Sequence, residues 1–198
     1  MDGIDMEEAA DPIALFGAWM KAAEASEPND ATAVALSTAT RDGMPSVRMV
    51  LMKRADQLGF RFYTNADSEK GVELAENPQA AMCFHWKSLR RQVRVSGSVS
   101  EQSAEEADEY FQSRSRLSQL AAVASEQSRV LASREVLEAR VRELESEFPG
   151  EIPRPEYWKG YLLRPERIEF WKNGAGRMHD RILFLKSGDG WRKERLYP

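Results

Sequence analysis

The sequence contains few of the residues that build disulfides and metal centres. Its 198 residues include one cysteine, Cys83, and two histidines, His85 and His179. A single cysteine excludes an internal disulfide, and one cysteine with two histidines is too few for a typical structural zinc site. We therefore expect a protein without a metal cofactor.

The sequence also lacks an excess of positive charge and long apolar runs. Its formal net charge of −4 at pH 7 argues against a protein that coats nucleic acid. No apolar run is long enough to cross a bilayer, and the start, MDGIDMEEAADP, is acidic where a signal peptide would be basic and then apolar. We expect a cytoplasmic protein that binds neither nucleic acid nor a membrane, and whose local basic clusters hold small ligands.

Motifs of several common chemistries are missing as well. The sequence has no Gly-rich dinucleotide fingerprint after a strand, no P-loop and no metal-ligand spacing. Acidic residues mostly line the predicted helices, so paired catalytic carboxylates cannot be assigned.

The elements that are present predict an α+β protein. Strands are expected where short apolar runs lie between glycine-containing turns, and helices where apolar residues recur at helical spacing. The predicted strands are 31–40, 46–54, 60–65, 79–86, 90–100, 166–173, 177–186 and 191–197, and the predicted helices are 11–25, 67–78, 103–125 and 133–148. About eight antiparallel strands with helices grouped between them favour a closed or nearly closed β-barrel. We expect a single domain over 1–198, with an N-terminal segment and helix (1–30), a helical insertion (103–148) and C-terminal strands (166–198).

The segment GRMHDRIL, residues 176–183, carries two arginines and a histidine at every second position. In a β-strand these side chains, Arg177, His179 and Arg181, would share one face. Such a cationic row can be a solvated sheet edge. Because the run continues into the apolar residues Ile182 to Leu185, it can also lead from an open site into the core and bind an anion.

Three other polar clusters lie beside apolar strand residues. They are RMVLMK, with Arg48 and Lys53; YTNADSEK, where a strand end and a helix start with Lys70 could bind phosphate; and RRQVRV, with Gln92 on one face. Each cluster alone is also compatible with an ordinary surface or core role. Together they indicate an anion-binding β-barrel with a phosphorylated ligand.

The four clusters, in this order, resemble the pyridoxine 5′-phosphate oxidase family, FMN enzymes of vitamin B6 synthesis and salvage. The resemblance runs from about Ala31 to Pro198 and rests on RMVLMK, FYTN, RRQVRVSG, YFQSR, EFW, RMHDR and the closing ERLYP. It implies a split FMN-binding barrel that works as a homodimer, with the flavin at the subunit interface. It also implies hydride transfer from C4′ of pyridoxine or pyridoxamine 5′-phosphate to the flavin, which gives pyridoxal 5′-phosphate, with O2 as acceptor and H2O2 as product.

The resemblance also assigns residues, motif by motif. The implied FMN contacts are Arg48, Met49, Val50, Leu51, Met52, Lys53, Tyr63, Thr64, Lys70, Gln92, Gln127, Ser128, Trp171 and Arg181. The implied substrate contacts are Lys53, Tyr110, Arg114 and Ser118 at the phosphate, with Arg177 and His179 at the pyridine ring as catalytic residues. Arg48 and Lys70 suit the flavin phosphate, because charge-assisted hydrogen bonds are strong.

Two departures from the family pattern stand out. Glu69 occupies a position where many relatives carry a basic residue beside the flavin phosphate, and we expect it to face solvent or pair with an arginine. The N-terminal segment is short and acidic and lacks the basic, tyrosine-containing arm that covers the substrate in some relatives. Two rival functions stay open: an FMN split-barrel oxidoreductase acting on another substrate, and a non-catalytic carrier of FMN or pyridoxal phosphate.

Overall fold

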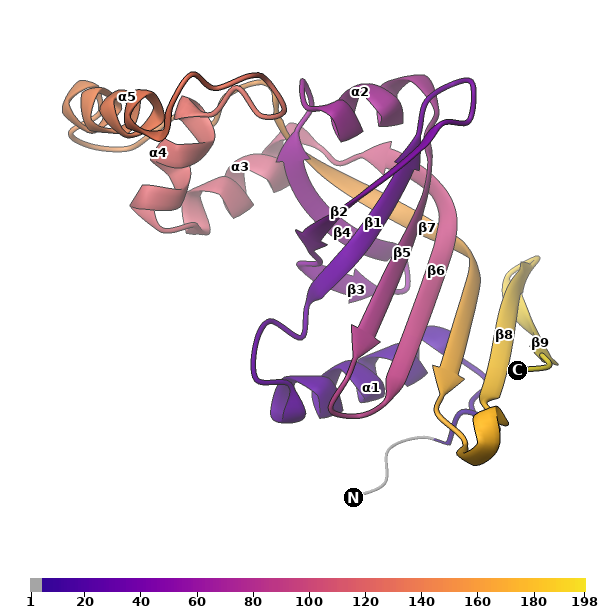
Figure 1. Ribbon diagram of the computed structural model, residues 1–198. Helices are drawn as coiled ribbons and strands as arrows, with labels where there is room; N and C mark the ends of the chain where they lie inside the picture. The colour runs from indigo at the N-terminus through magenta and orange to yellow at the C-terminus, as the bar shows by residue number, and fades with distance from the viewer. Residues whose placement is uncertain (1–4) are drawn as a thin grey trace.

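The computed structural model describes residues 5–198, so the first four residues of the predicted N-terminal segment lie outside it. The described chain forms one nine-stranded antiparallel sheet with five α-helices (Figure 1). The strands are β1 (Ala33–Ala39), β2 (Pro45–Leu51), β3 (Arg54–Asp56), β4 (Gly59–Asn65), β5 (Gln79–Trp86), β6 (Arg91–Glu101), β7 (Trp158–Lys172), β8 (Asp180–Ser187) and β9 (Gly190–Arg195). The helices are α1 (Pro12–Ser26), α2 (Glu69–Glu76), α3 (Ala104–Ser113), α4 (Arg116–Ala124) and α5 (Arg134–Glu147), with a short 3-10 turn η1 (Ala175–Arg177).

The sheet curls into a split barrel, which confirms the predicted α+β fold. Seven of its strands follow the order β2-β1-β5-β6-β7-β4-β3, while β8 pairs with β7 and β9 with β8. β2 and β3, the two ends of the seven-strand order, are consecutive in the chain. Only Met52 and Lys53 connect them: the Met52 amide donates to the Thr32 carbonyl at 3.0 Å, and the Lys53 amide donates to the Arg61 carbonyl at 2.8 Å. The single strand predicted over 46–54 is therefore wrong, because the chain leaves one edge of the sheet and joins the other at these residues.

β7 is the longest strand and begins eight residues before the predicted strand at 166. The prediction missed its first half because Pro165 lacks an amide hydrogen and normally interrupts a ladder. In the structure the register of β6 against β7 shifts between Ser96 and Gly97, opposite Pro165. This β-bulge lets one strand pair with β4 before the proline and with β8 after it.

The helices cover two different parts of the sheet (Figure 1). α1 packs its apolar side on the barrel core, with Phe16 in edge-to-face contact with Phe60 and Phe84 at 4.9 and 5.0 Å between ring centres. The helix predicted over 103–125 is two helices, because Ser115 accepts a hydrogen bond from the Ser118 amide and starts α4 anew. α3, α4 and α5 enclose a second, smaller core around Phe111.

The segment 176–183 is only partly a strand. Residues 175–177 form η1, Gly176 and Arg177 have positive φ angles of 60° and 65°, and β8 starts at Asp180. The predicted strand face shared by Arg177, His179 and Arg181 is therefore wrong for the first two residues, which lie in a turn. Within residues 5–198, no helix is both long and apolar enough to span a membrane.

Candidate functional site

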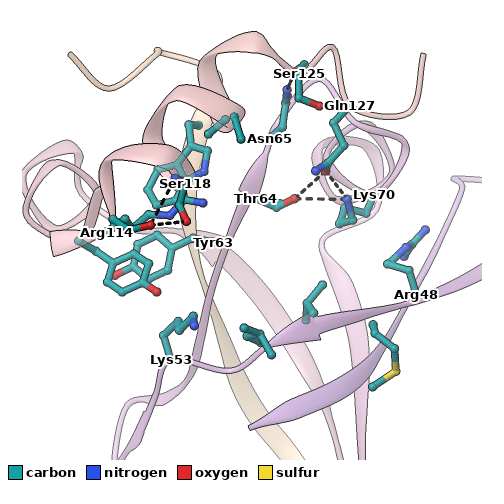
Figure 2. Close-up of a pocket in the computed structure, with 18 residues that line it drawn as sticks. Arg48, Lys53, Tyr63, Thr64, Asn65, Lys70, Arg114, Ser118, Ser125 and Gln127 are labelled. Carbon is teal, nitrogen blue, oxygen red and sulfur yellow. Dashed lines mark hydrogen bonds between the residues drawn. The ribbon is translucent and has the colours of Figure 1, made fainter. Parts of the chain in front are cut away.

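A cavity of about 690 Å³ lies where β2, β4 and β7 meet α2, α3 and α4 (Figure 2). Its size is typical of a small-molecule site. Twelve of the residues predicted from the family motifs line it: Arg48, Met49, Val50, Leu51, Lys53, Tyr63, Thr64, Lys70, Tyr110, Arg114, Ser118 and Gln127. The fold thus brings together residues from three separate segments, 48–53, 63–70 and 110–118, with Gln127.

Lys70 forms the cationic group at one end of the cavity. Its side chain is almost fully buried, and its ammonium donates to Gln127 Oε1 at 2.7 Å and to Thr64 Oγ1 at 3.3 Å (Figure 2). It also donates to Ser68 Oγ at 3.1 Å. All three partners are neutral. Burial, together with the charge of Arg48, lowers the pKa of Lys70 to about 8. A buried cation without a direct anionic hydrogen-bond partner is suited to receive an anion from a ligand.

Arg48 differs from Lys70, because the protein already supplies its anions. Its guanidinium donates to the hydroxyls of Thr38 and Ser46 and lies 3.4 Å from a carboxylate oxygen of Glu73 and 3.7 Å from one of Glu69. Glu69 thus pairs with an arginine, one of the two expected outcomes. Burial alone would raise the pKa of Glu73, but hydrogen bonds from Ser46 and Thr38 and the charge of Arg48 outweigh it and lower the pKa. Lys70 is therefore the less compensated cation of the pair.

The other end of the cavity is built on an aromatic stack. Tyr63 stacks on Tyr110 at 4.1 Å and on Trp158 at 5.2 Å between ring centres. The Lys53 ammonium lies 5.9 Å from the centre of the Tyr110 ring, and the Arg114 guanidinium lies 5.1 Å from that of Trp158. The rings hold these two cations at the wall of the cavity.

Arg114 has unused hydrogen-bonding capacity. Its Nη1 is buried and has no hydrogen-bond partner among the described residues, and burial lowers the pKa of its guanidinium. A buried donor without a partner is costly, so such an atom indicates a missing ligand or water. Ser118, whose hydroxyl lies 2.8 Å from that of Ser115, adds a polar group to the same wall. This end of the cavity therefore also fits an anion.

Six further residues line the cavity and were not predicted as site residues. They are Asn65, Ser115, Ala121, Ala122, Ser125 and Trp158. Asn65 ends the motif FYTN, so its position was visible in the sequence. Trp158 lies in the half of β7 that was missed before Pro165, and no sequence signal tied it to the other clusters.

Five predicted FMN contacts lie outside the cavity wall, and two of them, Met52 and Ser128, directly follow residues that line it. The Met52 side chain is buried in the core. Ser128 lies at the start of α2, where its hydroxyl accepts a hydrogen bond from the Glu69 amide at 3.3 Å.

The remaining predicted residues form a second group on β6, β7 and β8. Gln92 pairs with Trp171 across β6 and β7, and Trp171 pairs with Arg181 across β7 and β8. His179 packs on Trp171 with ring centres 4.7 Å apart, and Arg177 precedes it in η1. Trp171 lies thirteen residues after Trp158 on β7, about 40 Å along an extended strand, so this second group does not join the cavity of its own chain.

Comparison with known proteins connects these two groups to a family. The model of the pyridoxamine 5′-phosphate oxidase family matches residues 20–147, which include every predicted residue of the cavity. The chain belongs to this family. A second model, described as the pyridoxine 5′-phosphate oxidase C-terminal dimerisation region, matches residues 158–198. That region holds all of the second group except Gln92.

Individual relatives agree with this assignment. The chain is 54% identical to the pyridoxine/pyridoxamine 5′-phosphate oxidase of Gluconobacter oxydans over 96% of this chain and 95% of that protein. PhzG from Burkholderia lata, solved with tetrahydrophenazine-1-carboxylic acid, is 32% identical with a TM-score of 0.93 over 100% and 99% of the two chains. A pyridoxamine 5′-phosphate oxidase-related, FMN binding protein from Nostoc punctiforme is 16% identical and shares the fold, with a TM-score of 0.76 over 96% and 100% of the two chains.

Proposed function

We propose that this protein oxidises pyridoxine 5′-phosphate and pyridoxamine 5′-phosphate to pyridoxal 5′-phosphate, with FMN as cofactor and O2 as electron acceptor. The observation that carries the proposal is a single cavity with two separate cationic ends. Lys70 lies at one end, and Lys53 with Arg114 at the other. FMN and the substrate each carry one phosphate, so two anion sites in one cavity match this pair of molecules.

The residues of the cavity fit FMN. Lys70, with Thr64 and Gln127 around it, would hold the flavin phosphate, while the β2 segment from Met49 to Leu51 would lie along the rest of the cofactor. When bound, FMN supplies the group that takes a hydride from C4′ of the substrate and returns the electrons to O2 as H2O2. The side chains of the protein therefore need only bind and orient the reactants.

The substrate would bind with its phosphate at the aromatic end of the cavity. Lys53 and Arg114 would supply the positive charge, and the hydroxyl groups of Tyr110 and Ser118 would donate hydrogen bonds to the phosphate. This arrangement fixes one end of the substrate, so the position of its phosphate decides where C4′ lies.

The pyridine ring would be held by Arg177 and His179 of a second subunit. We propose a homodimer because the two groups of predicted residues lie apart in one chain, and because residues 158–198 match a dimerisation region. In such a dimer the η1 turn of one chain closes the cavity of the other. The fixed charge of the partner subunit's Arg177 would orient the ring and stabilise the oxygen that becomes the carbonyl.

A specific observation also keeps a second candidate in view. PhzG shares the fold at 32% identity and was solved with a tricyclic carboxylic acid, a ligand without a phosphate. Lys53, Tyr110, Arg114 and Ser118 favour a phosphorylated substrate, because two cations beside two hydroxyls match a phosphate group better than a single carboxylate. A carrier of FMN or pyridoxal phosphate would bind the same molecules without turnover.

The test is oxygen uptake together with pyridoxal 5′-phosphate formation after pyridoxine 5′-phosphate is added to the FMN-loaded protein. We expect the two signals at equal amounts. Arg177→Ala should lower kcat at least roughly a hundredfold and change FMN affinity much less, because its charge acts on the reacting substrate. Bound flavin with neither signal would favour the carrier or another substrate, and an unchanged kcat in Arg177→Ala would remove that residue from the reaction.

We also propose that the enzyme works in the cytoplasm.

A further inference from the structure

Glu169, in the motif EFW, is a buried carboxylate for which the function above gives no role. It lies on β7 and is 2% exposed, although it points to the outer face of the sheet with its neighbours Arg167 and Trp171. What covers it is a set of three guanidinium groups, those of Arg94, Arg167 and Arg181. One carboxylate among three arginines leaves this cluster with a net positive charge.

The two oxygens of Glu169 serve different arginines. Oε1 accepts from Arg181 Nε at 3.0 Å and from Arg181 Nη2 at 2.8 Å. Oε2 faces Arg94 at 3.4 Å and Arg167 at 3.8 Å. Only Arg181 makes a two-donor contact, which fixes the plane of its guanidinium as well as its position.

The third nitrogen of Arg181 is also held. Its Nη1 donates to the Tyr197 carbonyl at 2.8 Å, close to the end of the chain. Glu169 and Tyr197 together therefore determine where the guanidinium lies, and Trp171, the partner of Arg181 across the two strands, borders it. Arg181 is 24% exposed, so part of the group remains accessible.

We propose that Glu169 is a positioning residue that holds Arg181 in the orientation in which it contacts the flavin. This proposal rests on the function proposed above and on the family resemblance, which implies that Arg181 contacts FMN. Because Arg181 does not line the cavity of its own chain, that FMN would be the one bound by the other subunit. An arginine side chain has several rotatable bonds, and an anchor that fixes it before binding removes the entropy cost of ordering it. Arg94 and Arg167 place two further positive charges beside the carboxylate.

The contact predicts that Glu169 affects FMN binding only through Arg181. FMN would be titrated into flavin-free protein and its dissociation constant measured by flavin fluorescence. We expect Glu169→Gln to raise the dissociation constant about tenfold, the scale of one lost charge-assisted contact.

The double variant Glu169→Gln/Arg181→Gln should bind FMN no more weakly than Arg181→Gln alone. Arg167→Gln, which removes a neighbour of the other carboxylate oxygen, is the matched control and should stay within about twofold of the wild type.

Two results would overturn the proposal. One is an unchanged FMN dissociation constant in Glu169→Gln. The other is a double variant whose dissociation constant rises by the product of the two single-variant increases. If Glu169→Gln fails to fold by thermal unfolding, Arg181→Lys decides the question. Lysine keeps the charge, but its single nitrogen cannot form the planar contact that Nε and Nη2 of arginine make with Glu169. FMN should therefore bind as weakly as in Arg181→Gln, and wild-type affinity in Arg181→Lys would refute the role of Glu169. Wild-type protein that binds no FMN would instead contradict the proposed function.

Discussion

At the scale of single residues, the site is characterised by the different surroundings of its cations. Lys70 is buried among neutral groups, whereas Arg48 shares its charge with Glu69 and Glu73. The sequence motifs predicted both Lys70 and Arg48 as phosphate ligands, because motifs identify which positions carry charge. They could not show that Glu73, twenty-five residues further along the chain, already pairs with Arg48, because that contact is made by the fold.

FMN affinity should depend on the protonation of Lys70. The pKa of this lysine is lowered from 10.5 to about 8 in the flavin-free protein, and the phosphate binds the charged form. Below pH 8 the charge is present, and as pH rises above 8 a proton must be taken up on binding. We expect the dissociation constant to rise about tenfold per pH unit above 8 and to stay flat between 7 and 7.5.

The control is Lys70→Arg, which stays charged over this range. Flavin fluorescence titrations at pH 7 to 9.5 should show a flat profile for this variant. A flat profile for the wild type would show that Lys70 does not provide the charge for the phosphate.

Glu69 should weaken flavin binding slightly. Its carboxylate is 65% exposed and lies 3.7 Å from Arg48, so it draws the guanidinium away from an incoming phosphate and repels that phosphate. Because an exposed pair is screened by solvent, Glu69→Gln should tighten FMN binding only about two- to fivefold. Titration at low and high salt checks this, since the gain should shrink as salt rises. Weaker binding in Glu69→Gln would contradict this interpretation.

At the scale of elements, most strands followed from local patterns, and two of the errors share one cause. The alternation of apolar and polar residues, together with the turns between strands, predicted β1, β4, β5 and β6. The first half of β7, the division between β2 and β3, and the η1 turn were missed. In the first two cases a distant part of the molecule decides the backbone: a bulge of β7 against β6 permits Pro165, and the barrel seam requires the break at Met52.

Gly97 should be essential to that bulge. A Cβ atom there would lie 2.0 Å from the Arg164 carbonyl oxygen and 2.9 Å from the Glu166 amide nitrogen, and backbone atoms cannot move aside easily. We expect Gly97→Ala to lower the free energy of unfolding by about 2 kcal/mol or more, measured by urea denaturation at fixed protein concentration. Gly17→Ala is the control, since its Cβ would meet nothing within 4 Å in helix α1 and should leave stability unchanged or raise it slightly. Equal stability of the two variants would contradict the role of the bulge.

At the scale of the whole molecule, the functional residues fall into two groups that one chain keeps apart. The cavity lies at the α3 and α4 end of the barrel, and Arg177, His179 and Arg181 lie near β8 at the other end of β7 (Figure 1). The family motifs predicted the residues of both groups but not which chain supplies which, because sequence carries no direct record of subunit boundaries. In the proposed dimer, each site combines the cavity of one subunit with the η1 turn of the other.

Mixed dimers test this requirement most directly. Lys53→Met removes a cavity residue and Arg177→Ala a turn residue, so each homodimer should be nearly inactive. After the two variants are unfolded, mixed in equal amounts and refolded with FMN, half of the dimers should be hybrids, and each hybrid has one intact site. We predict that pyridoxal 5′-phosphate formation recovers to about a quarter of the wild-type rate. A mixture no more active than its two parents would contradict a site shared between subunits.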